Sequence, residues 1–307
     1  MQTFPKGARV CFVGDSLVAM NQTLPRIIDY YNKFMPEREV VFYNCGTSGG
    51  TCKSAIEYFY DDVLVHKPTH AVIAFGVNDS DRGSLQAERD VERYNRLVRA
   101  YEEYKENIKK YTQILQENGI EVVLCTPAIY DEYTKGSFPA LKGGYALILG
   151  YAEFIRSFAK EKGYPLCDYH KFLTKVMQED EAKIYTDDRV HPNEHGFYLM
   201  AKCFLAFQGV EIGKEETIPE YLDEWIAEVG KLRKVFGAEH MVIRNYQMPL
   251  AQKMAMIQEK VDKEDWGQPV FESFIRNYLV YKPLQSQLYE NIDRIYNKIL
   301  RYKDIDK

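Results

Sequence analysis

Two serines in this chain lie where a nucleophile could be placed, and the first question is which of them, if either, is the nucleophile. Ser16 lies in VCFVGDSLVAM at residues 10–20, and Ser48 lies in NCGTSGGT at residues 44–51. Both segments follow or contain an apolar run of the kind that forms a buried strand. The residues around Ser48 read G-x-S-x-G, a known pattern for a nucleophile on a sharp turn between a strand and a helix.

A serine that transfers an acyl group needs a base, usually histidine, and a third group that orients this base. The segment YTDDRVHPNEHG at residues 185–196 places Asp188 and His191 three residues apart, in a loop before a predicted helix. Pro192 fits the first turn of that helix. In α/β-hydrolases the acid and the histidine come from separate loops, and the serine follows a central strand. Ser48 follows only the second strand, so this arrangement favours Ser16.

The same loop offers a metal-binding alternative. His191, Glu194 and His195 spell H-x-x-E-H, a signature of one class of zinc enzymes. That signature requires both histidines on one face of a helix. A residue that precedes proline is disfavoured in the helical region, so His191 is expected to lie outside the helix that holds His195. We therefore expect no metal, and we expect His195 to be a helix-surface or packing residue.

Five strand-like runs alternate with helical patterns over roughly the first 170 residues. The runs are continuous and apolar, which indicates strands buried on both faces of a parallel sheet between two layers of helices. Ligands of such folds bind beyond the carboxyl ends of the strands, where the polar segments GDS, GTSGGT, GVND and TP all fall. The expected strands are 8–13, 39–43, 70–75, 120–125 and 164–168. The expected helices run from the first strand to about Phe34, from 53 to 67, from a cap at Ser84 to Glu117 with Gly119 ending it, and over 145–161.

No further strand run appears after about Phe207, and the pattern becomes helical at 217–236, 248–262 and 283–302. We therefore predict a catalytic domain at 1–210 and an all-α extension at 211–307. Trp266 and the aromatic-rich segment 271–289 indicate that the extension makes buried contacts. Our hypothesis is that it shapes access to the site, and its helices are also candidates for a homo-oligomer contact.

Four segments together resemble the conserved blocks of the SGNH/GDSL hydrolases. The chain is identified as a member of this family by the resemblance, which covers roughly residues 7–208 in the family's order. One mild departure is Gly50, where the family often has aspartate. The matching segments are Gly14-Asp15-Ser16-Leu17, then Ser48-Gly49-Gly50-Thr51 opened by Asn44, then Gly76-Val77-Asn78-Asp79, and finally Asp188-Arg189-Val190-His191-Pro192.

The resemblance implies a fold and a role for each matching residue. The fold would be a flavodoxin-like α/β/α sandwich with a five-stranded parallel sheet. Ser16 would be the nucleophile, His191 would take and return its proton, and Asp188 would orient His191. The Ser16 N–H, the Gly49 N–H and the Asn78 side-chain amide would form the oxyanion hole. No cofactor is implied. The G-x-S-x-G match at Ser48 would then be a coincidence.

Several neighbouring residues are expected to have structural roles instead. Asp15 and Ser48 are assigned to the scaffold, and Asp79 is expected to bond nearby backbone. Cys45 and Cys52 flank the second block and are expected to pack rather than react.

The catalytic set predicts ester or thioester hydrolysis but does not name the acyl group. Our first choice is a small acyl ester, such as an O-acetylated carbohydrate. The alternatives are a lipid-type acylhydrolase (a lysophospholipase or thioesterase) and a non-catalytic binding protein on the same fold. Substrate-binding residues are unknown, although the glycine- and tyrosine-rich insertion at 128–145 is a candidate substrate loop.

The composition restricts the partners and the setting of the protein. A net charge of −5 over 307 residues gives no reason to expect nucleic-acid binding. No run approaches 18 apolar residues, and no secretory signal is evident at the start, so no membrane insertion is expected. Six cysteines are scattered without a CxxC motif. These features favour buried thiols in a reducing compartment, and we expect a cytoplasmic protein that acts on a small-molecule ester.

Overall fold

The computed structural model describes residues 3–134, 138–179, 185–186, 188–210, 222–235, 287, 290–295 and 297. The chain divides into two compact units, Met1–Pro219 and Glu220–Lys307, which are described separately. The predicted division into a catalytic domain at 1–210 and an extension at 211–307 stays a prediction.

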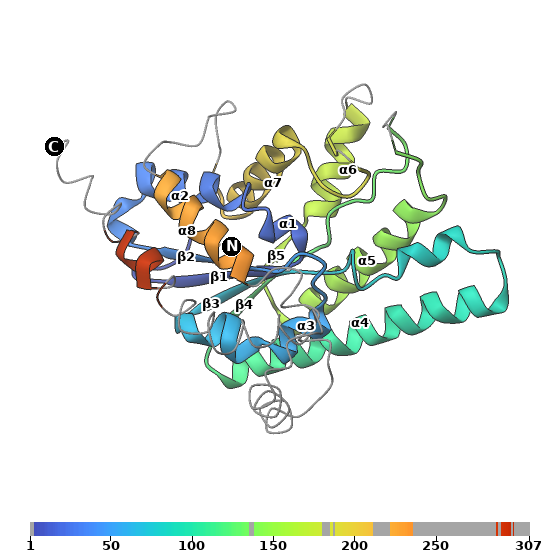
Figure 1. Ribbon diagram of the computed structural model, residues 1–307, viewed down its shortest axis with the longest axis horizontal. Helices are drawn as coiled ribbons and strands as arrows, with labels where there is room; N and C mark the ends of the chain where they lie inside the picture. The colour runs from blue at the N-terminus through green and yellow to red at the C-terminus, as the bar shows by residue number, and fades with distance from the viewer. Residues whose placement is uncertain are drawn as a thin grey trace, which may run out of the picture. The chain divides into compact units, whose positions relative to one another are not determined.

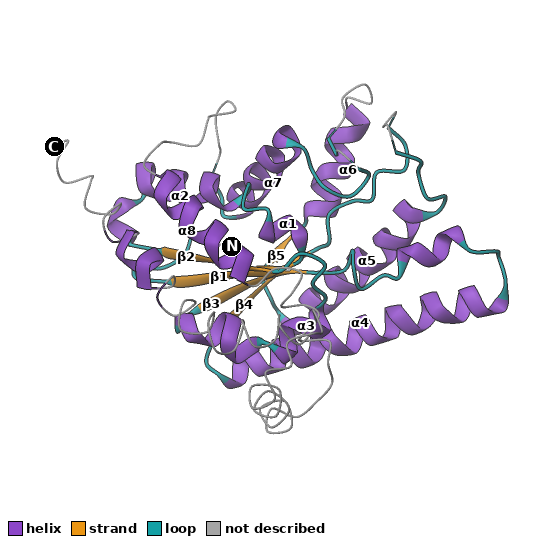
Figure 2. Cartoon of the chain, viewed as in Figure 1, coloured by secondary structure: helices purple, strands orange, loops and turns teal. Residues whose placement is uncertain are grey.

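The first unit is built around one parallel sheet of five strands, as the apolar runs predicted (Figure 2). The strands lie in the order β2-β1-β3-β4-β5, and each pairs in parallel with its neighbours. Their central residues are almost fully buried, which is why the sequence shows continuous apolar runs and no alternation. The strands are β1 (Arg9–Gly14), β2 (Val41–Gly46), β3 (His70–Ala74), β4 (Glu121–Cys125) and β5 (Leu166–Cys167).

The strand order reverses direction at β1, and this places three sequence blocks side by side. Gly14, the last residue of β1, pairs with Gly46 of β2 on one side and with Ala74 of β3 on the other. The turns that leave β1, β2 and β3 therefore meet at one edge of the sheet. In open α/β sheets this reversal is the usual position of a ligand site.

Helices cover both faces of the sheet and complete a three-layer sandwich (Figure 1). On one face, apolar side chains of β1, β3 and β4 pack against α4 and α5, for example Val13, Ile73 and Leu124 against Ile108 and Ile155. No helix of the described residues is long and apolar enough to cross a membrane. The helices on this face are α3 (Cys52–Glu57), α4 (Val91–Glu117) and α5 (Gly144–Lys162), and those on the other are α2 (Leu24–Phe34), α6 (Tyr169–Glu179) and α7 (Glu194–Phe207).

The single helix expected after β1 is wrong, because the chain forms two helices there. The short α1 (Ser16–Ala19) is separated from α2 by a turn in which Asn21 has φ 56°. This left-handed conformation is incompatible with a continuing right-handed helix and is one that asparagine adopts more readily than most residues. Pro25, in the first turn of α2, then fits a new helix start.

The helix expected at 53–67 is also shorter than predicted. α3 ends at Glu57, and the chain continues through a π-helical turn at Phe59–Val63 and a 3₁₀ turn at Leu64–His66. Lys67 then turns left-handed, with φ 48°, just before Pro68 and the start of β3.

The cap predicted for α4 is corrected as well. Asp90 caps this helix, since its carboxylate accepts the N–H of Arg93 at 2.7 Å. Ser84 instead lies in a 3₁₀ turn at Arg82–Gln86 and donates its hydroxyl to Asp81 at 2.6 Å. Both residue types are good helix caps, so the sequence offered two competing starts.

Pro192 does not lie in the first turn of α7, as expected, but just before its cap. Asn193 caps this helix by accepting the N–H of Gly196 at 2.9 Å. Pro192 instead pairs with Thr186 in an isolated antiparallel bridge.

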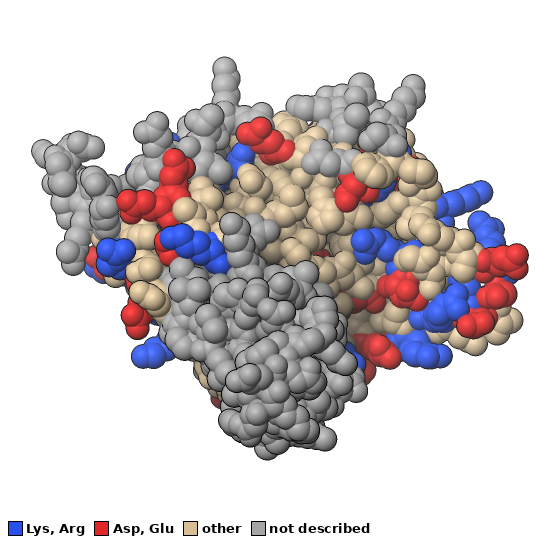
Figure 3. Space-filling view, viewed as in Figure 1, with Lys and Arg blue, Asp and Glu red and all other residues tan. Residues whose placement is uncertain are grey.

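Ion pairs between exposed side chains lie along the outer face of α4. They join Glu92 to Arg96 at 2.9 Å and Glu106 to Lys109 at 2.8 Å. On the face drawn in Figure 3, acidic and basic side chains of the described residues are interspersed. The described residues drawn on this face therefore form no broad basic surface of the kind that binds nucleic acid.

The described part of the second unit is helical. It contains α8 (Asp223–Val235), within the helix predicted at 217–236, and residues 290–295, within the helix predicted at 283–302. The helix predicted at 248–262, Trp266 and most of the segment 271–289 lie outside the described residues.

Candidate active site

The turn after β1 presents Ser16 at the start of α1. Asp15 has extended backbone and caps this helix by accepting the N–H of Leu17 at 3.0 Å. Ser16 is the first helical residue, so its N–H has no partner within the helix. The turn thus exposes a hydroxyl and a free backbone donor at one residue.

Ser16 and His191 meet across the sheet edge although 175 residues separate them. The Ser16 Oγ lies 2.8 Å from the His191 Nε2, and the His191 Nδ1 lies 2.7 Å from the Asp188 Oδ2. The His191 side chain is 31% exposed. The three side chains therefore form a continuous hydrogen-bonded series that a substrate can reach from solvent.

The carboxylate of Asp188 is held by its own loop. Its Oδ1 accepts the N–H of Val190 at 3.1 Å and the N–H of His191 at 2.7 Å. Burial acts to raise the pKa of Asp188, but the hydrogen bonds from His191 and Val190 outweigh it and leave the pKa below its usual value. A charged carboxylate can only accept a hydrogen bond, so Nδ1 carries the proton and Nε2 is left as the acceptor for the Ser16 hydroxyl.

The second block forms a tight turn beside Ser16. The N–H of Gly50 donates to the Thr47 carbonyl at 2.8 Å, and Gly49 between them has φ 72°, a conformation that favours glycine. The N–H of Thr47 donates to the Gly14 carbonyl at 3.0 Å, which fixes the turn to the end of β1. Ser48 is exposed and makes no hydrogen bond to a described residue.

The third block places Asn78 next to this turn. The Asn78 Nδ2 donates to the Gly50 carbonyl at 3.1 Å. The guanidinium of Arg82 donates to the Val77 carbonyl at 2.8 Å and lies 3.4 Å from the Asn78 Oδ1. These contacts orient the amide and leave its second N–H for a ligand. The oxyanion roles of Ser16, Gly49 and Asn78 stay predictions.

Two carboxyl groups accept backbone N–H groups of these turns; Asp15 is buried and Asp79 is partly buried. Asp79 accepts the N–H of Cys52 at 2.9 Å and the N–H of Gly76 at 3.1 Å, the backbone role expected for it. Burial raises the pKa of Asp79 to about 7, against those two hydrogen bonds, and the charge of nearby Asp15 adds to the increase. Burial likewise raises the pKa of Asp15 to about 6, against the Leu17 N–H and the charge of His191.

A small cavity lies behind the nucleophile turn and is distinct from the site. Its volume is about 30 Å³, and Asp15, Leu17, Val72 and Met200 are among its lining residues. Neither Ser16 nor His191 borders it. A volume of this order has room for about one or two waters, so it is too small to accept a substrate.

The H-x-x-E-H match does not assemble a metal site. His191 lies before α7, and the ring of His195 packs 5.5 Å from the ring of Tyr185 and 6.0 Å from that of Tyr198. Among the described residues, no group of three histidine, cysteine or acidic side chains is arranged to hold a metal ion.

Cys45 and Cys52 are buried, and burial raises the pKa of each thiol well above its usual value. Both are therefore expected to be poor nucleophiles at neutral pH.

Two further residues organise the site and were not assigned roles from the sequence. Asn44 donates to the Val18 carbonyl at 2.9 Å and to the Asn21 Oδ1 at 2.8 Å, and accepts the N–H of Gly46 at 3.0 Å. It therefore joins the end of β2 to α1. The sequence indicated Asn44 only through its position at the opening of the second block. Nothing in the sequence indicated the role of Arg82.

Comparison with known proteins identifies the family. Residues 12–199, more than half of the chain, match the GDSL-like lipase/acylhydrolase family. The chain belongs to this family. It is accordingly a carboxylic ester hydrolase of the GDSL/SGNH type.

Individual relatives are distant. An acetylxylan esterase from Geobacillus stearothermophilus is 20% identical over 220 residues, which cover 67% of this chain and 95% of the relative. The solved structure of an acetyl xylan esterase is 25% identical, with a TM-score of 0.51 over 64% of this chain and 98% of that one. The structure of a gut microbial diltiazem-metabolizing enzyme is 15% identical, with a TM-score of 0.72 over 98% of this chain and 96% of that one. The last comparison shows a shared fold over nearly the whole length.

Proposed function

We propose that this hydrolase cleaves small acyl esters, acetyl esters first among them, with Ser16 as the nucleophile. The observation that carries the proposal is the hydrogen-bonded series from Ser16 through His191 to Asp188, with distances of 2.8 and 2.7 Å. These distances and this order of groups are those that acyl transfer through a serine requires.

The reaction would proceed in two halves. The Ser16 hydroxyl gives its proton to the His191 Nε2 while its oxygen attacks the ester carbonyl. The protonated His191, stabilised by the Asp188 carboxylate, then gives the proton to the leaving alcohol, and the acyl group remains on Ser16. Water attacks this acyl-enzyme with His191 again as the base, and the acid is released. The Ser16 N–H, the Gly49 N–H and the Asn78 amide would stabilise the oxyanion in each half.

An O-acetylated carbohydrate is the substrate class that we propose first. The support comes from the two acetylxylan esterases named above, which at 20% and 25% identity indicate a direction and not a substrate. The runner-up is a lipid-type acyl ester or thioester. The third alternative from the sequence, a non-catalytic binding protein on the same fold, does not agree with the chain's place among the ester hydrolases.

A panel of esters tests the proposal. Hydrolysis would be followed for p-nitrophenyl esters of increasing chain length, for acetylated xylo-oligosaccharides and for a lysophospholipid, each with wild type and Ser16→Ala. We expect kcat/KM to be highest for acetyl esters and Ser16→Ala to be inactive. A maximum at long acyl chains would favour the lipid-type reading, and equal rates for the two proteins would refute the role of Ser16.

We also propose that the protein works in a reducing compartment such as the cytoplasm. The support is that all six cysteines are buried free thiols. Homo-oligomerisation through the C-terminal helices stays a proposal that light scattering at several concentrations would test.

A further inference from the structure

Arg189 holds an unusual backbone conformation between Asp188 and His191. Its φ is 80°, in the left-handed region that residues with a side chain seldom adopt. Such a conformation is strained for a residue with a side chain and persists only where the surroundings fix it. Because Arg189 lies inside the catalytic loop, the contacts that hold its backbone also affect where Asp188 and His191 lie.

Four hydrogen bonds join Arg189 to the insertion between β4 and α5. Its side chain is almost fully buried, at 7% exposure. The guanidinium donates to the Phe138 carbonyl at 2.8 Å, to the Thr134 carbonyl at 2.5 Å and, more weakly, to the Asp131 carbonyl at 3.4 Å. Its own carbonyl accepts the N–H of Asp131 at 2.9 Å. Backbone and side chain therefore bind the same segment.

Asp131 provides a second connection to the same loop. Its carboxylate, 1% exposed, accepts the N–H of Thr134 at 3.0 Å and also the Thr134 hydroxyl. It accepts the Thr186 hydroxyl at 3.1 Å as well. Thr186 opens the catalytic loop and pairs with Pro192 at its end. The insertion is thus hydrogen-bonded to the loop at two places, before Asp188 and between Asp188 and His191.

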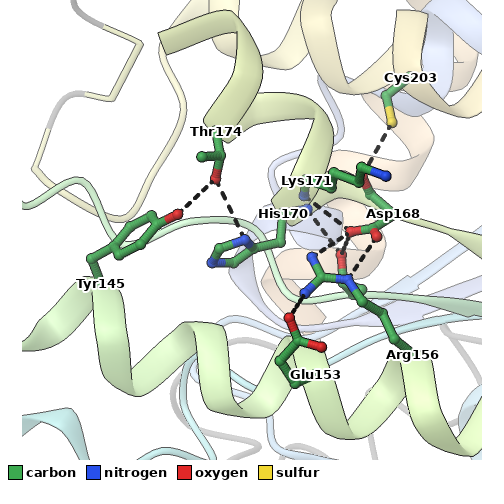
Figure 4. A network of polar contacts seen from close by, with 9 residues as sticks. Tyr145, Glu153, Arg156, Asp168, His170, Lys171, Thr174 and Cys203 are labelled. Atoms are coloured by element: carbon green, nitrogen blue, oxygen red, sulfur yellow. Dashed lines mark hydrogen bonds and ion pairs between the residues drawn. The ribbon is translucent and has the colours of Figure 1, made fainter. Parts of the chain in front are cut away.

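The far end of the insertion is fixed to the helices. The Glu132 carboxylate accepts the N–H of Gly143 at 2.9 Å and that of Tyr145 at 3.1 Å, which caps α5. The Tyr145 hydroxyl lies 3.2 Å from the Thr174 Oγ1 on α6 (Figure 4).

Below this contact, a bidentate ion pair joins α5 to the end of β5. The guanidinium of Arg156 donates to the Asp168 carboxylate at 2.7 and 3.0 Å (Figure 4). Asp168 also caps the start of α6 by accepting the N–H of Lys171 at 3.0 Å. The insertion is therefore bonded to α5 and α6, and α5 is in turn bonded to the end of β5.

We propose that Arg189 is a positioning residue that keeps His191 aligned with Ser16 by tying the catalytic loop to the insertion. This inference rests on the proposed function and goes beyond the family's matching blocks, since the insertion lies outside them. Without the guanidinium, the catalytic loop would lose its bonds to the Phe138 and Thr134 carbonyls, and the distance from Ser16 to His191 would vary.

The test uses Arg189→Gly and Arg189→Lys in the full-length protein. Glycine adopts a φ of 80° without strain, so Arg189→Gly removes only the side chain. We expect kcat on p-nitrophenyl acetate to fall on the order of tenfold to a hundredfold with KM little changed, because misplacement by about 1 Å has an effect of this size. Lysine keeps one donor group and should restore part of the rate. Thr186→Val removes the hydrogen bond from the Thr186 hydroxyl to Asp131 and should also lower kcat without changing KM.

The control is Arg38→Gly, which removes another arginine that donates to a backbone carbonyl, that of Phe4 at 2.8 Å, away from the insertion. Melting temperatures show which variants are folded at the assay temperature. If folded Arg189→Gly keeps the wild-type kcat, or changes only KM, the positioning role is refuted.

A readout that does not depend on turnover is the low-field proton resonance of the His191 Nδ1–H. This resonance should broaden or vanish in Arg189→Gly but persist in Arg38→Gly. An inactive wild type would refute the proposed function, whereas an unchanged resonance would refute this inference by itself.

Discussion

The carboxylate of Asp188 decides which nitrogen of His191 carries a proton. It faces Nδ1 at 2.7 Å and is held there by two backbone N–H groups, so Nε2 is left to accept from Ser16. The same hydrogen bonds lower the pKa of Asp188, which keeps the acid charged throughout the neutral range. Orientation of the base is therefore set by a loop of four residues.

Asn78→Ala removes one donor of the predicted oxyanion hole. We expect kcat to fall about 10²–10³-fold with KM little changed, because the amide would bind the transition state more strongly than the substrate. Steady-state kinetics with p-nitrophenyl acetate measure this effect. The matched control is Asn95→Ala on the exposed face of α4, which should leave both constants unchanged. An equal small loss in both variants would remove Asn78 from the site.

Asp79 should make stability depend on pH. Its pKa is raised from 3.8 to about 7 in the folded protein, so the folded state binds more protons than the unfolded state between these values. The free energy of unfolding should therefore fall as pH rises from about 4 to about 7, at about 1.4 kcal/mol per pH unit at most for this group. In Asp79→Asn that fall should be shallower.

Urea unfolding at several pH values measures the slope for Asp79→Asn. The control is Glu88→Gln, a variant of an exposed carboxyl group, which should follow the wild type. Parallel curves for wild type and Asp79→Asn would show that Asp79 ionises normally in the folded protein.

Residue types, short spacings and the family resemblance singled out Ser16, Asp188 and His191, and the structure brings these three side chains together. Their catalytic roles stay predictions. Contacts that depend on tertiary packing carried no such signal. Arg82 and Arg189 bind carbonyls of other turns or of the insertion, and nothing in their own sequence neighbourhoods indicates those partners.

At the scale of elements, the close approach of α1 to β2 brings the first two blocks together. A Cβ added at Gly46 would lie 2.3 Å from the Ala19 nitrogen, so only glycine lets the end of β2 lie this close to the helix. Asn44 and the Thr47 N–H then tie the second block to the first.

Gly46→Ala should therefore displace α1 together with Ser16. We expect a loss of about 1–3 kcal/mol in the free energy of unfolding, as for overpacking of a core, and a lower kcat. The matched control is Gly150→Ala, in α5, where an added Cβ meets no atom within 4 Å. This change should stabilise the protein by about 0.5–1 kcal/mol through helix propensity. Denaturant unfolding compares the two, and a neutral Gly46→Ala would contradict the packing argument.

The strands were the most predictable elements, since double-sided burial leaves an unbroken apolar run. Helix starts were less predictable where two good capping residues competed, as at Ser84 and Asp90. The break between α1 and α2 depends on the left-handed turn at Asn21, a conformation that a helical pattern of apolar residues conceals.

At the scale of the whole molecule, every group of the predicted catalytic set lies in the first unit, Met1–Pro219. The acetylxylan esterase from Geobacillus stearothermophilus matches 67% of the chain, whereas the diltiazem-metabolizing enzyme shares the fold over 98% of it. The family match, residues 12–199, lies within the first unit, so the contribution of the second unit is a separate question.

A chain truncated after Pro219 addresses this contribution. We expect it to hydrolyse p-nitrophenyl acetate, because the first unit contains the sheet and every residue of the predicted catalytic set. We also expect its preference across ester lengths to change, as our hypothesis that the extension shapes access requires. Circular dichroism verifies folding and the ester panel gives the preference. A folded fragment with the wild-type preference would end that hypothesis.

The proposal that Ser16 is the nucleophile is tested most directly by finding which serine carries the acyl group. Wild type, Ser16→Ala and Ser48→Ala would each be mixed with p-nitrophenyl acetate, quenched in acid during turnover, digested and analysed by peptide mass. We predict an acetyl group on the peptide that contains Ser16 in wild type and Ser48→Ala. We predict neither adduct nor turnover in Ser16→Ala, and measurable turnover in Ser48→Ala. An acetyl group on Ser48, or wild-type turnover in Ser16→Ala, would contradict the proposal.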